Sequence, residues 1–160
     1  MADPHHLPLL LQGAYDAAQR DVYATLGAVE GQLAAQRFLC GPRFTEADLR
    51  LFPTIVRFDP VYAVLFKCSR RRVADYPNLS AWMRDVHALR VPHSQLQIAD
   101  CFDLEDARRS YFAQLFPLNP GGIVTSGPTA EDLGLGQPAG RGPGRLEDAF
   151  HLLPAPVPAA

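Results

Sequence analysis

The stretch FTEADLRLF, residues 44–52, carries the clearest helix start in the sequence. Thr45 is of a residue type favoured at the N-cap, and Asp48 follows three positions later, where its carboxylate can accept the N–H of the N-cap residue. Glu46 and Asp48 also place negative charge in the first turn, where the helix dipole favours it. We therefore predict that Thr45 and Asp48 form a capping box that starts a helix and contributes roughly 1 kcal/mol.

Two prolines lie downstream of this helix start. Pro53 lacks an N–H and its ring clashes with the carbonyl of Leu49, which predicts a bend. In VRFDPVYAVLFKC, residues 56–68, we interpret Asp59 and Pro60 as a helix restart, with the aspartate as cap and the proline at the first helical position.

Three further segments have helical periodicity. Apolar residues recur at three- and four-residue spacing over residues 14–36, another helix is expected from about Pro77, and a short one over residues 103–116. No segment among the first 116 residues alternates convincingly as a strand does. The fold class predicted is therefore all-α, a bundle of four to five helices with a disordered tail rich in proline and glycine.

Composition changes sharply near residue 117. Residues 117–160 hold eight of the 15 prolines and eight of the 12 glycines, and such a segment buries too little apolar surface to offset its ordering entropy. We predict three parts: an unstructured start at residues 1–13, a helical domain at 14–128, and a flexible low-complexity tail at 129–160. A weak helical turn is expected around residues 146–152.

Charge and hydropathy argue against several classes of function. A net charge of −2 gives no general reason to expect nucleic acid as a partner. No apolar run approaches the roughly 18 residues that a membrane span requires, so no membrane partner is expected. The first residues carry neither a basic segment nor a small-residue cleavage site, and so do not predict a secretory signal.

The titratable side chains form no recognisable catalytic or metal motif. The three cysteines, Cys40, Cys68 and Cys101, are widely spaced and are interpreted as small buried hydrophobes in a reducing compartment. Cys68 follows a lysine but has no visible base, so it is a weak nucleophile candidate. Tyr62 and Tyr111 both lie in apolar surroundings, where a buried phenol needs a hydrogen-bond partner. On periodicity alone, both are core or interface residues.

The combination of FTEADLRLF, TIVRFDPVYAVLFKC, DYPNLSAWMRDV, SYF and NPGGIVTSGP resembles the C-terminal helical domain of Xi-class glutathione transferases, the glutathionyl-hydroquinone reductases. The resemblance covers about residues 14–128. The helix start and the Tyr-Pro-Asn-Leu segment are general to transferase helical domains, whereas RFDPVY with FKC and the late NPGGI segment are specific to this class.

The resemblance implies an enzyme of two domains that forms a homodimer in the cytoplasm, or in an organelle if a presequence precedes it. A thioredoxin-like half binds the co-substrate glutathione and carries the catalytic cysteine, whose thiolate attacks the sulfur of a glutathionyl-quinol. The helical half forms the wall of the quinol pocket, and the tyrosines that face the substrate match Tyr62 and Tyr111. No metal is implied, and no catalytic residue is expected on this chain.

This sequence also departs from the family pattern. The residues before position 14 resemble no thioredoxin-like half, and no Cys-Pro-Trp-Ala motif occurs. The segment before Tyr111 is about six residues longer than the family's usual spacing, and Ser110 stands where a histidine often does. We therefore expect a fragment that is inactive alone. The alternative is a non-catalytic module for dimerisation or protein interaction, and the weakest hypothesis is an enzyme that uses Cys68 or Cys101 by itself.

Overall fold

The computed structural model of the chain describes residues 6–91, 95–114 and 118–141. Within these ranges all regular elements are helical, and two isolated β-bridges extend into no strand. The elements in chain order are α1 (His6–Ala35), α2 (Glu46–Arg57), η1 (Phe58–Tyr62), α3 (Ala63–Leu65), η2 (Val73–Asp75), α4 (Pro77–His87), η3 (Ile98–Cys101) and α5 (Leu104–Gln114). η1 is π-helical, and η2 and η3 are 3₁₀ turns. The prediction of an all-α fold is confirmed.

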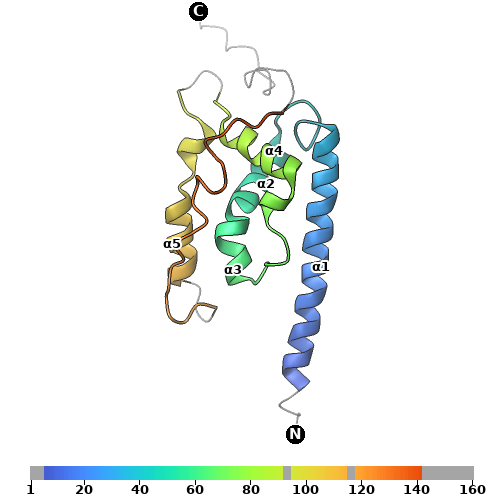
Figure 1. Cartoon of the computed structure of the whole chain (residues 1–160), viewed down its shortest axis with the longest axis vertical. Helices are drawn as coiled ribbons and strands as arrows, with labels where there is room; N and C mark the ends of the chain where they lie inside the picture. The colour runs from blue at the N-terminus through green and yellow to red at the C-terminus, as the bar shows by residue number, and fades with distance from the viewer. Residues whose placement is uncertain (1–5, 92–94, 115–117, 142–160) are drawn as a thin grey trace, which may run out of the picture.

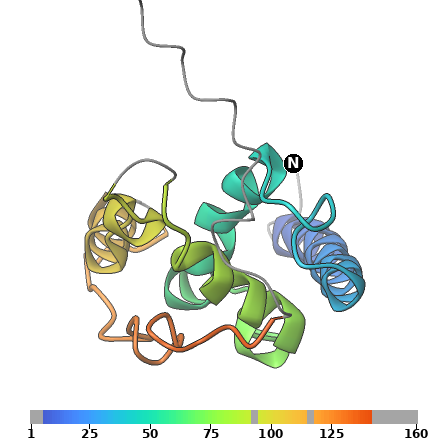
Figure 2. The same ribbon diagram turned by 90° about the horizontal axis from the view of Figure 1, so that it is seen from above.

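The helices surround one core. α2, α3 and α4 lie between α1 and α5, and the N-terminal half of α1 extends beyond the other helices (Figures 1 and 2). Leu33 of α1, Phe52 of α2 and Trp82 of α4 are buried members of this core. The prediction that residues 1–13 are unstructured is wrong for residues 6–13, because α1 begins at His6.

Asp48 ties the start of α2 to its neighbours. Its carboxylate accepts the Thr45 N–H at 3.0 Å and the Thr45 hydroxyl at 3.1 Å, as a capping residue does. It also accepts the Leu39 N–H and the Trp82 Nε1–H, both at 2.9 Å. Asp48 is completely buried, so each of these donors offsets the cost of removing a carboxylate from water.

α4 is held against α1 by polar contacts at both ends. The Glu30 carboxylate of α1 accepts the backbone N–H groups of Asn78 at 3.0 Å and Leu79 at 2.7 Å. These donors lie in the first turn of α4, where the helix itself provides no acceptor. Near the other end of α4, Arg37 makes a two-pronged ion pair with Asp85 at 2.9 and 3.1 Å. α4 therefore starts where α1 supplies its cap.

The helix that starts at Thr45 does not end at either proline. α2 continues through Pro53, and the chain then passes into the π-helical segment η1 instead of restarting at Asp59. The buried Asp59 carboxylate accepts the Val73 N–H at 2.8 Å, so it caps η2 rather than its own helix. Burial raises the pKa of Asp59 above its usual value, against the lowering effect of this hydrogen bond.

The prediction of a flexible tail from Thr129 is wrong for residues 129–141. Leu133 and Leu135 are buried in the core, and Gly134 between them has a φ of +66° that suits glycine. The Arg141 guanidinium donates to the Leu33, Gln36 and Asn78 carbonyls, at 2.6, 2.7 and 2.8 Å. Residues 129–141, called the strap below, cross from α5 over α4 toward the end of α1 (Figure 2). The predicted turn at 146–152 lies outside the described residues.

Candidate functional site

An apolar groove of about 630 Å³ lies between α1 and the segment from α2 to Cys68. Six of the residues that line it are Tyr15, Val22 and Leu26 from α1, and Phe58, Tyr62 and Phe66 opposite. The aromatic rings opposite α1 are in contact, since the Tyr62 ring lies 6.4 Å from that of Phe58 and 5.3 Å from that of Phe66. A groove of this size and lining suits a small aromatic molecule.

The two tyrosines named from the sequence lie together in space. The Tyr62 and Tyr111 hydroxyl oxygens are 3.3 Å apart, and either hydroxyl is able to donate. Their rings meet edge to face at 5.7 Å, so η1 and α5, separated by 49 positions in the chain, present one pair of phenols. Hydrogen bonds between hydroxyls usually span about 2.5–3.0 Å. Each hydroxyl has one proton and two lone pairs, so the hydroxyl that accepts in this pair keeps its own proton for a third oxygen.

The environment of Tyr62 changes its acidity. Burial, followed by the hydrogen bond to Tyr111, raises the pKa of the Tyr62 phenol above its usual value. A hydrogen bond from the Arg57 side chain acts in the opposite direction. At neutral pH the Tyr62 hydroxyl therefore carries its proton and is able to donate it to a ligand oxygen.

The cysteines are placed differently from the prediction. Cys68 is buried and lines the groove, where its sulfur accepts a hydrogen bond from Gln19 Nε2 at 3.2 Å. Cys40 and Cys101 are exposed, so their interpretation as buried hydrophobes is wrong. Among the described residues no basic side chain is hydrogen-bonded to any of the three sulfurs. The geometry therefore offers no activated nucleophile in these parts of the chain.

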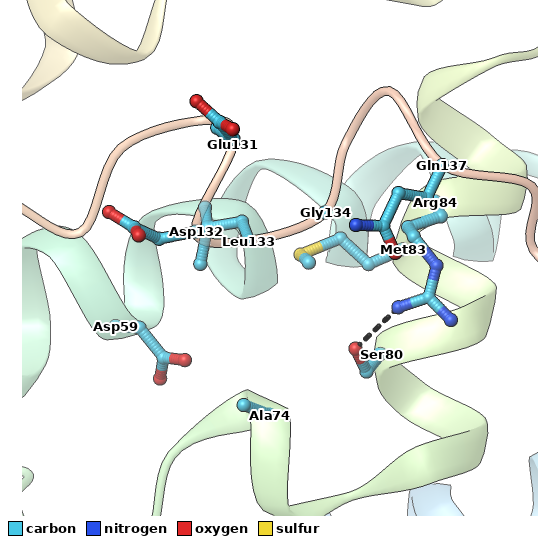
Figure 3. Close-up of a pocket in the computed structure, with 10 residues that line it drawn as sticks. All are labelled: Asp59, Ala74, Ser80, Met83, Arg84, Glu131, Asp132, Leu133, Gly134 and Gln137. Atoms are coloured by element: carbon cyan, nitrogen blue, oxygen red, sulfur yellow. Dashed lines mark hydrogen bonds between the residues drawn. The ribbon is translucent and has the colours of Figure 1, made fainter.

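A second cavity, of about 160 Å³, lies under the strap (Figure 3). Asp59 caps η2, Asp132 accepts the Thr129 N–H at 2.8 Å, and Arg84 donates to Ser80 at 2.9 Å, while the buried Arg84 Nε has no hydrogen-bond partner among the described residues.

Two kinds of feature are absent from the described residues. No helix within 6–91, 95–114 and 118–141 has the length and hydropathy to cross a bilayer. The same residues bring together no group of three or more histidine, cysteine, aspartate or glutamate side chains that could hold a metal ion.

Sequence reasoning missed two residues that line the groove, Tyr15 and Gln19. Tyr15 donates from its hydroxyl to the Lys67 carbonyl at 2.5 Å, and Gln19 reaches Cys68, so both join α1 to the end of α3. Neither contact has a sequence signal, because each depends on how the chain is placed in space.

Residues 12–85 match the family described as "Glutathione S-transferase, C-terminal domain". This part of the chain is a glutathione transferase C-terminal domain, and the resemblance to the Xi class is confirmed by the relatives that follow.

The chain is 39% identical over 130 residues to the glutathionyl-hydroquinone reductase YqjG of Escherichia coli, covering 81% of this chain and 37% of the relative. It is 44% identical over 117 residues to the glutathionyl-hydroquinone reductase PcpF of Sphingobium chlorophenolicum, covering 73% and 36%.

Solved structures agree. The glutathione-bound structure of YqjG superposes with a TM-score of 0.71 at 40% identity, covering 81% of this chain and 39% of that one. The Xi transferase of Phanerochaete chrysosporium superposes with a TM-score of 0.66 at 42% identity, covering 73% and 36%. The chain thus spans little more than a third of the length of the curated relatives that it matches.

Proposed function

We propose that this chain is the helical, quinol-binding domain of a glutathione-dependent reductase that acts on glutathionyl-hydroquinones. The observation that carries the proposal is the pair of phenols, Tyr62 and Tyr111, with hydroxyl oxygens 3.3 Å apart, of which Tyr62 lines the apolar groove. The groove would receive the aromatic ring of the quinol, and the phenols would bond its oxygen.

The reaction divides between two parts of a longer polypeptide. A thiolate attacks the sulfur of glutathionyl-hydroquinone, the carbon–sulfur bond breaks, its electron pair passes to the ring, and a proton is added there to give hydroquinone. A second glutathione then resolves the enzyme–glutathione disulfide, so that glutathione is oxidised as the conjugate is reduced. The described residues contain no activated thiol, so we assign the thiolate and the glutathione site to a thioredoxin-like domain outside this chain.

In this proposal, the helical domain contributes to the reaction through its tyrosines. The Tyr62 hydroxyl, kept protonated by burial, would donate to the quinol oxygen or supply the proton that the ring takes up. We expect the 160-residue chain to bind the conjugate but to show no thiol-dependent turnover. Thiol-dependent reduction by the purified chain would contradict this division of roles.

Binding can be measured directly by calorimetric titration of the 160-residue chain with glutathionyl-hydroquinone. We expect Tyr62→Phe and Tyr111→Phe each to weaken binding by about 3- to 10-fold, since each removes one hydrogen bond of about 0.5–1.5 kcal/mol. Tyr76→Phe is the matched control, because Tyr76 is buried in the core and does not line the groove. Equal binding by all four proteins would remove the phenol pair from the site.

A second function, self-association, has its own observation. Val64 and Phe66 are 49% and 39% exposed although apolar, and Phe66 borders the groove. Such surfaces often meet another polypeptide. We propose that the chain forms a homodimer; light scattering at micromolar concentration should give twice the monomer mass, and a monomer would contradict the proposal.

A cytoplasmic location remains a prediction, which localisation of a tagged full-length protein would test.

A further inference from the structure

The turn at residues 119–123 is held against the end of α5. Asn119 Nδ2 donates to the Phe112 carbonyl at 2.7 Å and to the Ile123 carbonyl at 3.0 Å. The Gly122 N–H closes the turn on the Asn119 carbonyl at 3.0 Å, and Gly122 has a φ of +61° that suits glycine. The Phe112 carbonyl lies in the last turn of α5, where the helix itself provides no donor. Asn119 therefore caps α5 and fixes the turn to it.

A second hydrogen bond joins the same segment to α5. The Arg108 guanidinium donates to the Pro128 carbonyl and is paired with Glu105, and Arg108 is buried, with 1% of its surface exposed. After the turn at 119–123 the chain therefore runs back along α5 to Pro128, where the strap follows (Figure 1). Residues 119–128, called the return segment below, are thus tied to α5 near both of their ends.

The two ties lie on either side of Tyr111 in α5. Arg108 precedes Tyr111 by three positions, a spacing at which side chains are neighbours on one helix face, and Phe112 follows it directly. This end of α5 packs on η1 and α3 through a small apolar cluster, against which Tyr62 and Tyr111 lie. The buried members of the cluster are Phe112, Val61 and Leu65.

We propose that Asn119 and Arg108 are positioning residues that, through the return segment, hold the Tyr111 hydroxyl against that of Tyr62. Apolar packing has no preferred direction, whereas a hydrogen bond holds its donor and acceptor within narrow limits of distance and angle. The cluster therefore attaches the end of α5, and the two ties set how the helix is turned.

This inference rests on the proposed function, because it concerns the geometry in which the phenol pair would meet a quinol oxygen. It also gives a role to the NPGGI segment, residues 119–123, which resembles the Xi class specifically. None of these five residues lines the groove, so the segment would act on the ligand only through Tyr111.

Calorimetric titration of the 160-residue chain with glutathionyl-hydroquinone tests the role of Asn119. Asn119→Ala should weaken binding about 3- to 10-fold, as much as Tyr111→Phe, because in both variants one phenol hydroxyl no longer reaches the ligand. Combining the two substitutions should weaken binding no further, since both act through the same hydroxyl. Asn78→Ala is the matched control: it removes the other asparagine of the chain, whose Nδ2 donates to Glu30 at 2.8 Å, and it should leave binding unchanged.

A second measurement needs no ligand. Burial and, after it, the hydrogen bond to Tyr111 raise the pKa of the Tyr62 phenol. In protein with ¹³C-labelled tyrosine, Asn119→Ala should therefore lower the pKa of Tyr62 toward its value in Tyr111→Phe, because the displaced hydroxyl no longer contacts it. Asn78→Ala should leave this pKa unchanged. If Asn119 only stabilised the fold, its loss would lower the unfolding temperature and leave the pKa of Tyr62 as it is in the wild type.

The outcomes separate this inference from the proposed function. If Asn119→Ala binds as tightly as the wild type, or if its effect adds in full to that of Tyr111→Phe, the role of Asn119 is overturned while the proposed function stands. If the wild type does not bind glutathionyl-hydroquinone, the proposed function fails. The pKa of Tyr62 then decides alone: a lowered value in Asn119→Ala supports the positioning role, and an unchanged value overturns it.

Arg108→Lys tests the other tie and decides if Asn119→Ala does not fold. Lysine keeps the charge beside Glu105 but loses the planar fork that also reaches Pro128. A pKa of Tyr62 lowered toward its value in Tyr111→Phe supports the positioning role of the return segment, and an unchanged pKa contradicts it.

Discussion

The two ends of α2 are built in opposite ways. At its start, the Asp48 carboxylate is completely buried and receives four hydrogen bonds from three different parts of the chain. Beyond its end, the Tyr62 and Tyr111 hydroxyls are joined by one long contact of 3.3 Å. Satisfied polar groups stabilise a fold, whereas donors that lack partners are available to a ligand. The start of the helix therefore serves stability, and its end leads into the pair of phenols for which we propose a binding role.

The largest expected effect on stability comes from removing the Asp48 carboxylate at the start of α2. Asp48→Ala leaves the Trp82 indole and the Leu39 and Thr45 N–H groups without their acceptor, and we expect the free energy of unfolding to fall by about 4 kcal/mol. Urea unfolding followed by Trp82 fluorescence measures this. Asp48→Asn, which keeps an acceptor oxygen, is the matched control and should lose less. If the alanine variant lost less than about 1 kcal/mol in the free energy of unfolding, these four hydrogen bonds would not be a main source of stability.

The strap is also expected to stabilise the fold, through Arg141, the last described residue. Arg141→Ala removes the donors to the Leu33, Gln36 and Asn78 carbonyls, which include orphan acceptors at the end of α1. We expect about 2 kcal/mol of destabilisation in urea. Arg109→Ala, on α5, is a charge-matched control that breaks none of the three bonds. Equal stability of the Arg141 variant and the wild type would mean that the strap contributes little.

The pH dependence of stability offers a smaller test at Asp59. Because burial raises the pKa of this carboxyl in the folded state, the folded chain binds its proton more tightly than the unfolded chain. The resulting stability is present below the unfolded pKa of about 3.9 and is lost as pH rises through the folded pKa.

Asp59→Asn cannot ionise, so its stability relative to the wild type should increase between pH 4 and pH 7 in urea titrations. Asp100→Asn, at an exposed site, is the control. A relative stability of Asp59→Asn that stays constant or falls over this range would contradict the direction of the shift.

The smallest effect on stability is expected beyond the end of α2, at the pair of phenols proposed to bind the ligand. Tyr62→Phe combined with Tyr111→Phe removes both hydroxyls but keeps the rings, and we expect less than about 1 kcal/mol of change, since the pair lost is one long hydrogen bond. Thermal unfolding and calorimetric binding on the same protein measure both properties. The comparison between the two ends of α2 would be wrong if this double variant lost stability but kept its affinity for glutathionyl-hydroquinone.

Local chemistry explains which features could be predicted. Thr45 and Asp48 mark a helix start whichever way the chain packs, and the 3.6-residue apolar period predicted α1 and α4 before any contact was known. Tyr62 and Tyr111 were named together through a family resemblance, and the structure places them in contact. Their role in binding a substrate stays a prediction.

Other features depend on contacts between distant residues. The composition of residues 129–141 predicts a flexible chain, yet the two leucines on either side of Gly134 and the single Arg141 guanidinium are enough to hold it on the core. Composition counts apolar residues over a window, whereas packing depends on where a few of them land. Cys40 and Cys101 are the opposite case: cysteine is buried on average, and residue type therefore predicts burial, but both side chains are exposed.

The sequence by itself determined the helical class, the start of α2 and the family, because each is written in residues that lie close together in the chain. Only the tertiary structure decided that Asp59 caps η2, that the strap closes over α4, and that the Tyr62 hydroxyl meets that of Tyr111. These outcomes follow from which polar groups lose water when the helices pack, and a buried donor or acceptor takes the partner that packing brings within reach.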